Sequence, residues 1–154
     1  MDDFEIARSL HVLAVVMWIG GVAFVTTVIF PAVRRSNEAH DQLSAFEAIE
    51  RNFAPQARVW VLVAGLTGFW MVYRANLWTW FLAPHNWWLQ AMLGLWLIFA
   101  TMLFILEPLV IHRRMKASTR PEADFNRLER MHRVLFVIGL IVIVGGVGGV
   151  HGLF

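Results

Sequence analysis

The first long apolar run of the chain extends from Ile6 to Val33 and reads IARSLHVLAVVMWIGGVAFVTTVIFPAV. Its one Lys, Arg, Asp or Glu residue is Arg8, and it exceeds the roughly 20 apolar residues that a helix needs to cross the hydrocarbon core of a bilayer. A cleavable signal peptide begins with basic residues, whereas this chain begins with the acidic sequence MDDFE. We therefore expect the run to be a retained membrane span.

Three further runs are similarly apolar, at residues 57–73, 87–111 and 131–154. With the run at residues 6–33 they make four candidate spans. They lack the alternation of a transmembrane β-strand, and a helix pairs its own backbone groups in hydrocarbon, so each run is predicted to be a helix. Of all 154 residues 58% are apolar and 16% are charged, against about 25% charged in soluble domains. The sequence predicts an all-α polytopic membrane protein, a single four-helix transmembrane bundle (residues 1–154) in the lipid bilayer.

The basic residues predict the orientation of these spans. Most of the 13 lysines and arginines lie in two connections, residues 34–58 and 112–133, and such basic connections remain in the cytoplasm. Both termini and the aromatic connection at residues 76–86 are therefore expected outside, in a multi-pass protein of the inner (plasma) membrane. The net charge is only +2, with the basic residues between spans, which argues against a nucleic-acid partner. With no cysteine, the chain cannot form a disulfide or attach a c-type haem covalently.

The two basic connections also carry helix signals. Leu43, Phe46, Ile49 and Phe53 share one helical face, which predicts either a short helix on the membrane or an extension of the second span. The sequence at residues 119–122 (TRPE) predicts a capping box, with the fourth helix beginning in the cytoplasm near the proline.

Two histidines are predicted to lie at one depth in the membrane. His11 lies near the outer end of the first span and His151 near the outer end of the last, so at about 1.5 Å of rise per residue their levels agree within several ångströms. Imidazoles at matched depth on two helices suit the axial positions of a haem b. The sequence therefore predicts haem b with bis-histidine ligation near the outer side, in an electron-transfer role.

Small and flat residues accompany these two histidines. Gly148 and Gly149 precede His151 and would leave room for a porphyrin, while Trp18 shares a helical stripe with His11 and could lie against the macrocycle. The alternative is that these glycines, in the pattern Gly145-x-x-x-Gly149, serve close helix packing.

Further polar residues suggest additional sites. A second haem between His112 and His132, near the cytoplasmic ends of two spans, is a weaker expectation, with nearby arginines for the propionates. Glu107 lies inside the third span, where a carboxylate should face the bundle, and its expected partner is Arg58 or Arg35. The pair would be either a buried ion pair or a proton-handling group.

Copper is the alternative cofactor. His11, His151 and His85, the histidine of the outer connection, would bind Cu(I) together with Met17 or Met92, because Cu(I) accepts imidazole and thioether ligands. Methionine in an apolar chain is also an ordinary core residue.

A family resemblance rests on the first span, in the run from Leu10 to Gly21 (LHVLAVVMWIGG) and then Phe30-Pro31-Ala32. This order of a histidine, a Trp-x-Gly-Gly and a later proline resembles the first helix of the copper-resistance protein D-like membrane family. Residues 51–54 (RNFA) and 65–68 (GLTG) are similar to its second helix. The resemblance implies a small helical membrane protein that binds haem b in some branches or takes up copper in others, with His11 carried over as a ligand.

Three rivals to the haem electron carrier stay open. They are copper binding or transport, a HemJ-type protoporphyrinogen oxidase, and a membrane subunit with no cofactor. The HemJ-type enzymes look distantly related, but here no lysine lies within a predicted span. Whether the chain is an oxidoreductase enzyme is also open. A redox partner protein would bind on the outer side, and a homo-oligomer is compatible with the sequence.

Overall fold

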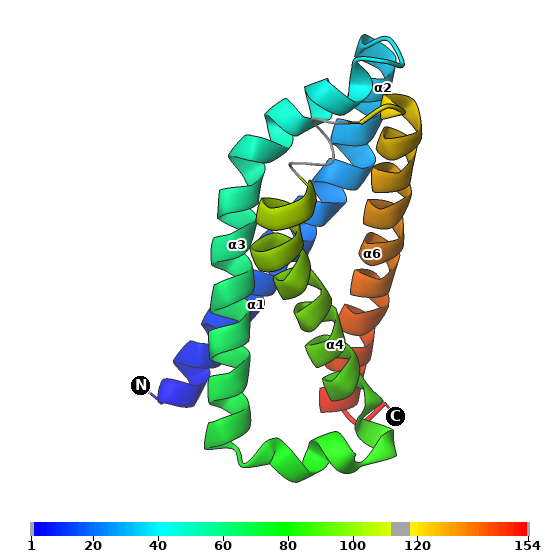
Figure 1. Ribbon diagram of the computed structural model, residues 1–154. Helices are drawn as coiled ribbons and strands as arrows, with labels where there is room; N and C mark the ends of the chain where they lie inside the picture. Colours follow the sequence, from blue (N-terminus) through cyan, green and yellow to red (C-terminus); the bar gives the residue numbers. More distant parts are fainter. Residues whose placement is uncertain (1, 112–117, 154) are drawn as a thin grey trace.

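The computed structural model describes residues 2–111 and 118–153, and the described chain is helical with no strand (Figure 1). A first rod is made by α1, a π-helical segment η1 and α2, and the longest helix, α3, follows it. The elements are α1 (Asp3–Phe24), η1 (Val25–Ile29), α2 (Phe30–Ser36), α3 (Gln42–Arg74), η2 (Leu77–Leu82), η3 (Pro84–Asn86), α4 (Trp87–Thr101), η4 (Met102–Ile111) and α6 (Pro121–Val150). The predicted all-α class is confirmed.

Within the described residues, three stretches are long and apolar enough to cross a membrane: Asp3–Ser36, Pro84–Leu109 and Pro121–Val150. They contain the whole of the predicted first span and most of the predicted third and fourth spans. The second predicted span, residues 57–73, lies within α3 and is not among the three, so it stays a prediction. Many apolar side chains on the helices are exposed, such as Leu66 at 70% and Val144 at 67%, as expected for a surface that faces lipid.

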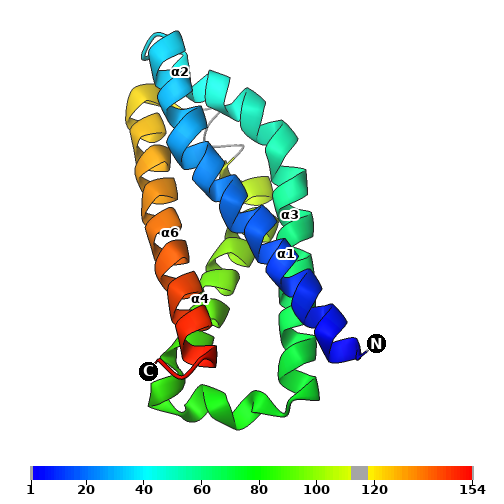
Figure 2. The ribbon, with the colours of Figure 1, turned by 180° about the vertical axis from the view of Figure 1, so that it is seen from behind.

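The helices run between two ends of an elongated molecule (Figures 1 and 2). Both termini lie at the end that carries η2 and η3, and the connection from α2 to α3 lies at the opposite end with the start of α6. In both views α1 runs diagonally, beside α3 in its N-terminal part and toward α6 further on. The C-terminal part of α6 runs beside α4. This arrangement places the two chain ends at one level but on different helix pairs.

The core lies in two clusters. The central one is built by small and large apolar residues from four helices: Ala14, Trp18, Ile19 and Val22 of α1, Val61 and Ala64 of α3, Leu95 and Phe99 of α4, and Leu135 and Val142 of α6. The second lies at the α2 end, where Phe30 stacks on Phe46 at a centroid distance of 4.5 Å and Phe125 packs edge-on to both.

The second cluster explains how the connection after α2 folds. Leu43 and Phe46 are buried in it, and α3 begins at Gln42 and continues unbroken to Arg74. The stripe from Leu43 to Phe53 is therefore continuous with the helix of residues 57–73 and does not form a separate short helix. Burial of this apolar face against α2 and α6 stabilises the extension, because each buried large side chain contributes about 1.5–3 kcal/mol.

The start of α6 is partly as predicted. Pro121 is the first helical residue, where its missing N–H costs nothing. The capping box is wrong, because Arg120 occupies the N-cap position and no described side chain caps the helix from there. Instead the Ser118 hydroxyl donates to Oδ2 of Asp124 at 2.7 Å.

Candidate functional site

The His11 ring faces α3. Its Nδ1 lies 2.9 Å from the carbonyl oxygen of Ala64 and 3.2 Å from the hydroxyl oxygen of Thr67. The Thr67 hydroxyl donates to Val63 at 2.6 Å, so both neighbours of Nδ1 act as acceptors and Nδ1 carries the proton. Gly68 makes room for the imidazole ring, because a Cβ at this position would lie only 3.2 Å from Cε1 of His11.

This arrangement leaves the other ring nitrogen of His11 as a base. Nε2 has no hydrogen-bond partner among residues 2–111 and 118–153. Histidines that bind metals in proteins characteristically donate the other ring N–H to a carbonyl or carboxylate, which fixes the tautomer and the direction of the ring. The ring of His11 is oriented in this way.

His151 directly follows α6 and is exposed. Its Nδ1 donates to the carbonyl oxygen of Val147 at 2.8 Å, one turn earlier in the same helix. The ring is therefore held against its own helix, while His11 faces α3. The structure does not bring the two rings together, although both helix ends lie at the same end of the molecule (Figures 1 and 2). Their joint ligation of a cofactor stays a prediction.

The glycines before His151 serve helix packing. A Cβ at Gly149 would collide with the indole of Trp88, and a Cβ at Gly145 would lie 2.5 Å from the ring of Trp87. Gly148 is buried in the same face of α6. In the structure the space beside Gly149 is filled by an α4 side chain, because α4 and α6 approach closely there, and the expected role of Gly148 and Gly149 beside a porphyrin stays a prediction.

Trp18 lies in the core with 6% of its surface exposed, edge-on to Phe99 at a centroid distance of 5.0 Å. Its indole Nε1 is buried and has no hydrogen-bond partner within the described part of the chain. Buried donors without an acceptor are rare in folded proteins. The side chain lines two cavities.

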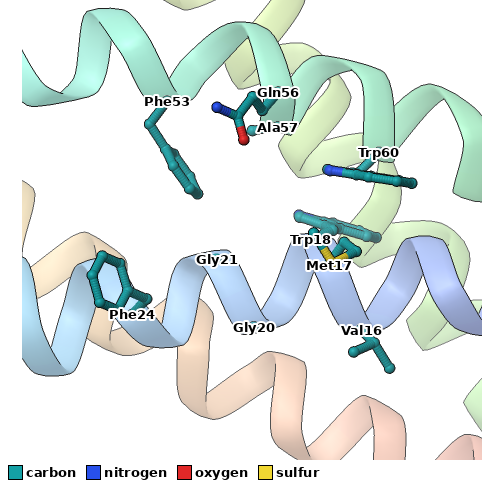
Figure 3. A pocket seen from close by; sticks show the side chains of 10 residues that line it. All are labelled: Val16, Met17, Trp18, Gly20, Gly21, Phe24, Phe53, Gln56, Ala57 and Trp60. Carbon is teal, nitrogen blue, oxygen red and sulfur yellow. The ribbon is translucent and has the colours of Figure 1, made fainter.

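The first cavity has a volume of about 270 Å³ and lies between α1 and α3 (Figure 3). Gly20 and Gly21 form its α1 wall, and Phe53 extends from α3 over Gly21. Trp18 and Trp60 lie opposite each other at one end, as Figure 3 shows. A Cβ on Gly21 would lie 2.5 Å from the Phe53 ring, so this glycine lets the ring pack closely against α1, whereas a Cβ on the exposed Gly20 would meet nothing within 4 Å.

The second cavity, of about 60 Å³, shares Trp18 and Phe53 with the first, and Glu50 and His132 are among the residues that line it. Nδ1 of His132 donates to the carbonyl oxygen of Leu128 at 3.0 Å, and the ring packs 5.1 Å from that of Phe30. Burial, followed by the negative charges of Glu107 and Glu47, raises the pKa of Glu50 to about 7.

Sequence reasoning missed Glu50, although a signal was present. Glu50 lies four residues after Phe46 and three before Phe53, on the apolar stripe that predicts the start of α3. A carboxylate at an apolar position of such a stripe points into the bundle. The stripe was interpreted from its apolar members alone.

The expected partner of Glu107 is Arg58, and the structure confirms this contact. Nη2 of Arg58 donates to Oε1 of Glu107 at 3.0 Å, and Glu107 is only 5% exposed. Nε of the same arginine donates to the carbonyl oxygen of Leu103 at 3.0 Å. In the π-helical segment η4 that carbonyl would be paired with the N–H five residues later, which Pro108 lacks. The arginine therefore satisfies both a buried carboxylate and a backbone acceptor that the proline leaves free.

The remaining candidates lie apart from these sites. His85 is exposed in η3, and His112 lies outside the described residues, so the second haem site with His132 stays a prediction. Met17 lines the first cavity, whereas Met92 packs against Gly146 of α6. No group of three or more His, Cys, Asp or Glu side chains gathers as a metal site in residues 2–111 and 118–153.

No family model, curated protein or solved structure matches the chain. The resemblance to the copper-resistance protein D-like family and, more distantly, to HemJ-type enzymes therefore stays an expectation from the first two spans.

Proposed function

We propose that the chain is a membrane haem b protein in which Nε2 of His11 is an axial ligand of the iron, and that it transfers electrons. The observation that carries the proposal is the hydrogen bond from Nδ1 of His11 to the Ala64 carbonyl, at 2.9 Å. It fixes the tautomer whose Nε2 is unprotonated and leaves that nitrogen free to bind iron. When bound, haem supplies an iron that accepts and releases single electrons.

The kind of ligand set favours haem over a copper ion. A copper ion takes all its ligands from the protein, whereas a porphyrin brings its own equatorial nitrogens and needs the protein only for axial ones. Within the described residues no three or more His, Cys, Asp or Glu side chains gather around one point. One well-oriented imidazole can fill one axial position of a haem iron, whereas a single imidazole does not hold a copper ion.

His151 is the proposed second axial ligand. Its Nδ1 is also bonded to a backbone carbonyl, so its Nε2 is unprotonated as well, and its exposure leaves that nitrogen accessible. Both histidines belong to helix ends on the same side of the molecule. Ligation by both would require these helix ends to approach each other on the cofactor, so the role of His151 has its own test below.

We propose further that the protein lies in the inner membrane with both termini outside. The support is the charge pattern of the connections, together with three helices of membrane-spanning length and composition. A haem near His11 would then lie toward the outer face, accessible to a redox partner there.

The proposal is tested on protein purified from membranes of cells supplied with haem. We expect a Soret band and sharp α and β bands on reduction in the wild type. His11→Ala should lose most of the haem, and His40→Ala, an exposed histidine paired with Glu38 and Asp41 at the other end, should retain it. A colourless wild type that binds Cu(I), or full haem content in His11→Ala, contradicts the proposal. Full haem content and unchanged bands in His151→Ala would exclude it as second ligand.

A further inference from the structure

An arginine cluster lies where α2 meets the N-terminal part of α6 (Figures 1 and 2). Nη2 of Arg34 donates to Oε2 of Glu129 and, at 2.8 Å, to Oδ1 of Asn126. Nη2 of Arg133 donates to Oε1 of the same Glu129 at 2.8 Å. One carboxylate thus holds two guanidinium groups, one from each helix, and the proposed haem site makes no use of them.

Both guanidinium groups keep donors for a further anion. Each makes these contacts through Nη2 alone, so Nε and Nη1 have no hydrogen-bond partner within the described residues. Arg130 lies one turn before Arg133 on the surface of α6, is exposed, and forms no ion pair with the described part of the chain. Glu129 offsets only one of these three positive charges, so the cluster attracts an anion.

The cluster is held in place before any ligand binds. The side chain of Glu129 is only 14% exposed, and the guanidinium group of Arg34 lies 5.3 Å from the centroid of the Phe125 ring, which is fully buried. A cation over an aromatic face is attracted to it. Because Arg34 is already ordered by these contacts, binding an anion costs less side-chain entropy than it would on free surface arginines.

The level of the cluster along α6 matches the head groups of a bilayer. Val134 and Val137, which follow it on the outward side of the helix, are apolar and half exposed. Residues 134–150 extend for about 25 Å, close to the hydrocarbon thickness of about 30 Å. Arg130 and Arg133 precede this stretch by about 6 Å at most, which is roughly the thickness of one head-group layer.

We propose that this cluster binds the phosphate of an anionic phospholipid, whose acyl chains lie along Val134 and Val137. Phosphate oxygens accept from guanidinium N–H groups in the paired geometry that arginine offers. A zwitterionic phospholipid would bring an ammonium group to a positively charged cluster, so a head group of net negative charge is preferred. The proposal requires that α6 spans a membrane, and it depends neither on haem nor on the orientation of the chain.

The test is native mass spectrometry of the delipidated protein, titrated in detergent with a phosphatidylglycerol or with a phosphatidylcholine of the same acyl chains. We expect saturable binding of the phosphatidylglycerol, at least tenfold tighter than that of the phosphatidylcholine. The double variant Arg130→Gln with Arg133→Gln should weaken binding of the anionic lipid about thirtyfold, or about fivefold for each arginine.

The matched control is Arg8→Gln with Arg74→Gln, which removes the same number of charges at the other end of the molecule. There Arg8 pairs with Glu5 and Arg74 with Asp3. This variant should bind the phosphatidylglycerol as the wild type does. Thermal unfolding without added lipid shows whether each variant is folded. If loss of the Arg133 contact prevents folding, Arg130→Gln alone, which breaks no contact in the described chain, should still weaken binding about fivefold.

Four results overturn the proposal. They are no saturable binding to the wild type, equal affinity for the two phospholipids, equal weakening in the two double variants, and displacement of the phosphatidylglycerol by an equal concentration of inorganic phosphate. The third would show that only the overall charge of the protein matters, and the last would assign the cluster to a free anion.

Discussion

At the residue scale, the pair of Arg58 and Glu107 is the most constrained polar contact. Glu107 is 5% exposed, and the arginine also satisfies the Leu103 carbonyl left by Pro108. Arg58→Met should therefore destabilise the protein by about 3–5 kcal/mol, because it leaves a buried charge unpaired. Thermal unfolding in detergent measures the loss.

Two variants serve as controls for this prediction. Arg74→Met breaks the bonds from Arg74 to Asp3, in which both side chains are nearly half exposed, and should lower the unfolding temperature much less, because solvent screens an exposed pair. The double variant Arg58→Met with Glu107→Gln should be more stable than Arg58→Met alone, since no unpaired charge remains. If Arg58→Met and Arg74→Met lower the unfolding temperature equally, breaking the buried pair costs no more stability than breaking the exposed one, which contradicts the prediction.

Glu50 predicts a dependence of stability on pH. Its pKa is about 7 in the folded protein, against an ordinary value of 4.5, because it is buried near Glu107 and Glu47. The folded state thus holds this proton more tightly than the unfolded chain does, and its contribution to stability is lost as the pH rises from about 4.5 to about 7. Glu50→Gln should remove this loss of stability. In the wild type the loss reaches at most about 3 kcal/mol once the pH exceeds about 7.

The measurement is the unfolding temperature of the wild type and Glu50→Gln at several pH values across this window. The difference should grow with pH and then remain constant above about 7. Glu38→Gln, which removes an 85% exposed carboxylate at the same end of the molecule, is the control. A difference that is constant over the window, or that shrinks as the pH rises, would contradict the account.

At the scale of elements, the contact of α4 with α6 depends on glycine. Gly149→Ala should destabilise the protein by about 1–3 kcal/mol, because the new Cβ would meet the Trp88 ring, which fills the space. Gly94→Ala has open space and should be neutral or stabilising by about 1 kcal/mol, since alanine is the better helix former. The two unfolding temperatures are compared directly. Equal changes would mean that Gly149 is not a packing residue.

The elements themselves were largely predictable from the sequence. Apolar runs of sufficient length predict helices, the stripe from Leu43 to Phe53 predicts the start of α3, and Pro121 predicts the start of α6. The π-helical segments η1 and η4 were not predicted, because hydrophobic periodicity does not resolve a one-residue change in hydrogen-bond spacing. Their nearby prolines, Pro31 and Pro108, are the signal that accompanies them.

At the scale of the whole molecule, charge predicts topology and the fold is consistent with it. Both termini lie at the same end as η2, opposite the end where α2 connects to α3 and where Arg34 and Arg35 end α2 (Figure 1). The chain has no cysteine, so single cysteines can be placed without a background. In intact cells, a membrane-impermeant maleimide should label Thr79→Cys, and Ala39→Cys only after permeabilisation. The reverse pattern would overturn the orientation.

The candidate site shows what sequence alone could not supply. Depth along a helix follows from residue number, so His11 and His151 could be assigned to one level. The direction of a side chain around its helix depends on which helix packs beside it, and α1 packs on α3 there while α6 ends beside α4 (Figures 1 and 2). For Glu107 the same reasoning succeeded, because a carboxylate inside a span needs a cation at its own depth and Arg58 was one of two available.

The central claim is that His11 holds haem iron through Nε2, and replacing the ring chemically tests it most directly. His11→Gly removes the imidazole and leaves a space beside Gly68. The account predicts that the purified variant loses the reduced α and β bands and regains them when imidazole is added, while buffer without imidazole restores nothing. Bands that persist in His11→Gly without imidazole, or a folded variant that imidazole does not restore, would contradict it.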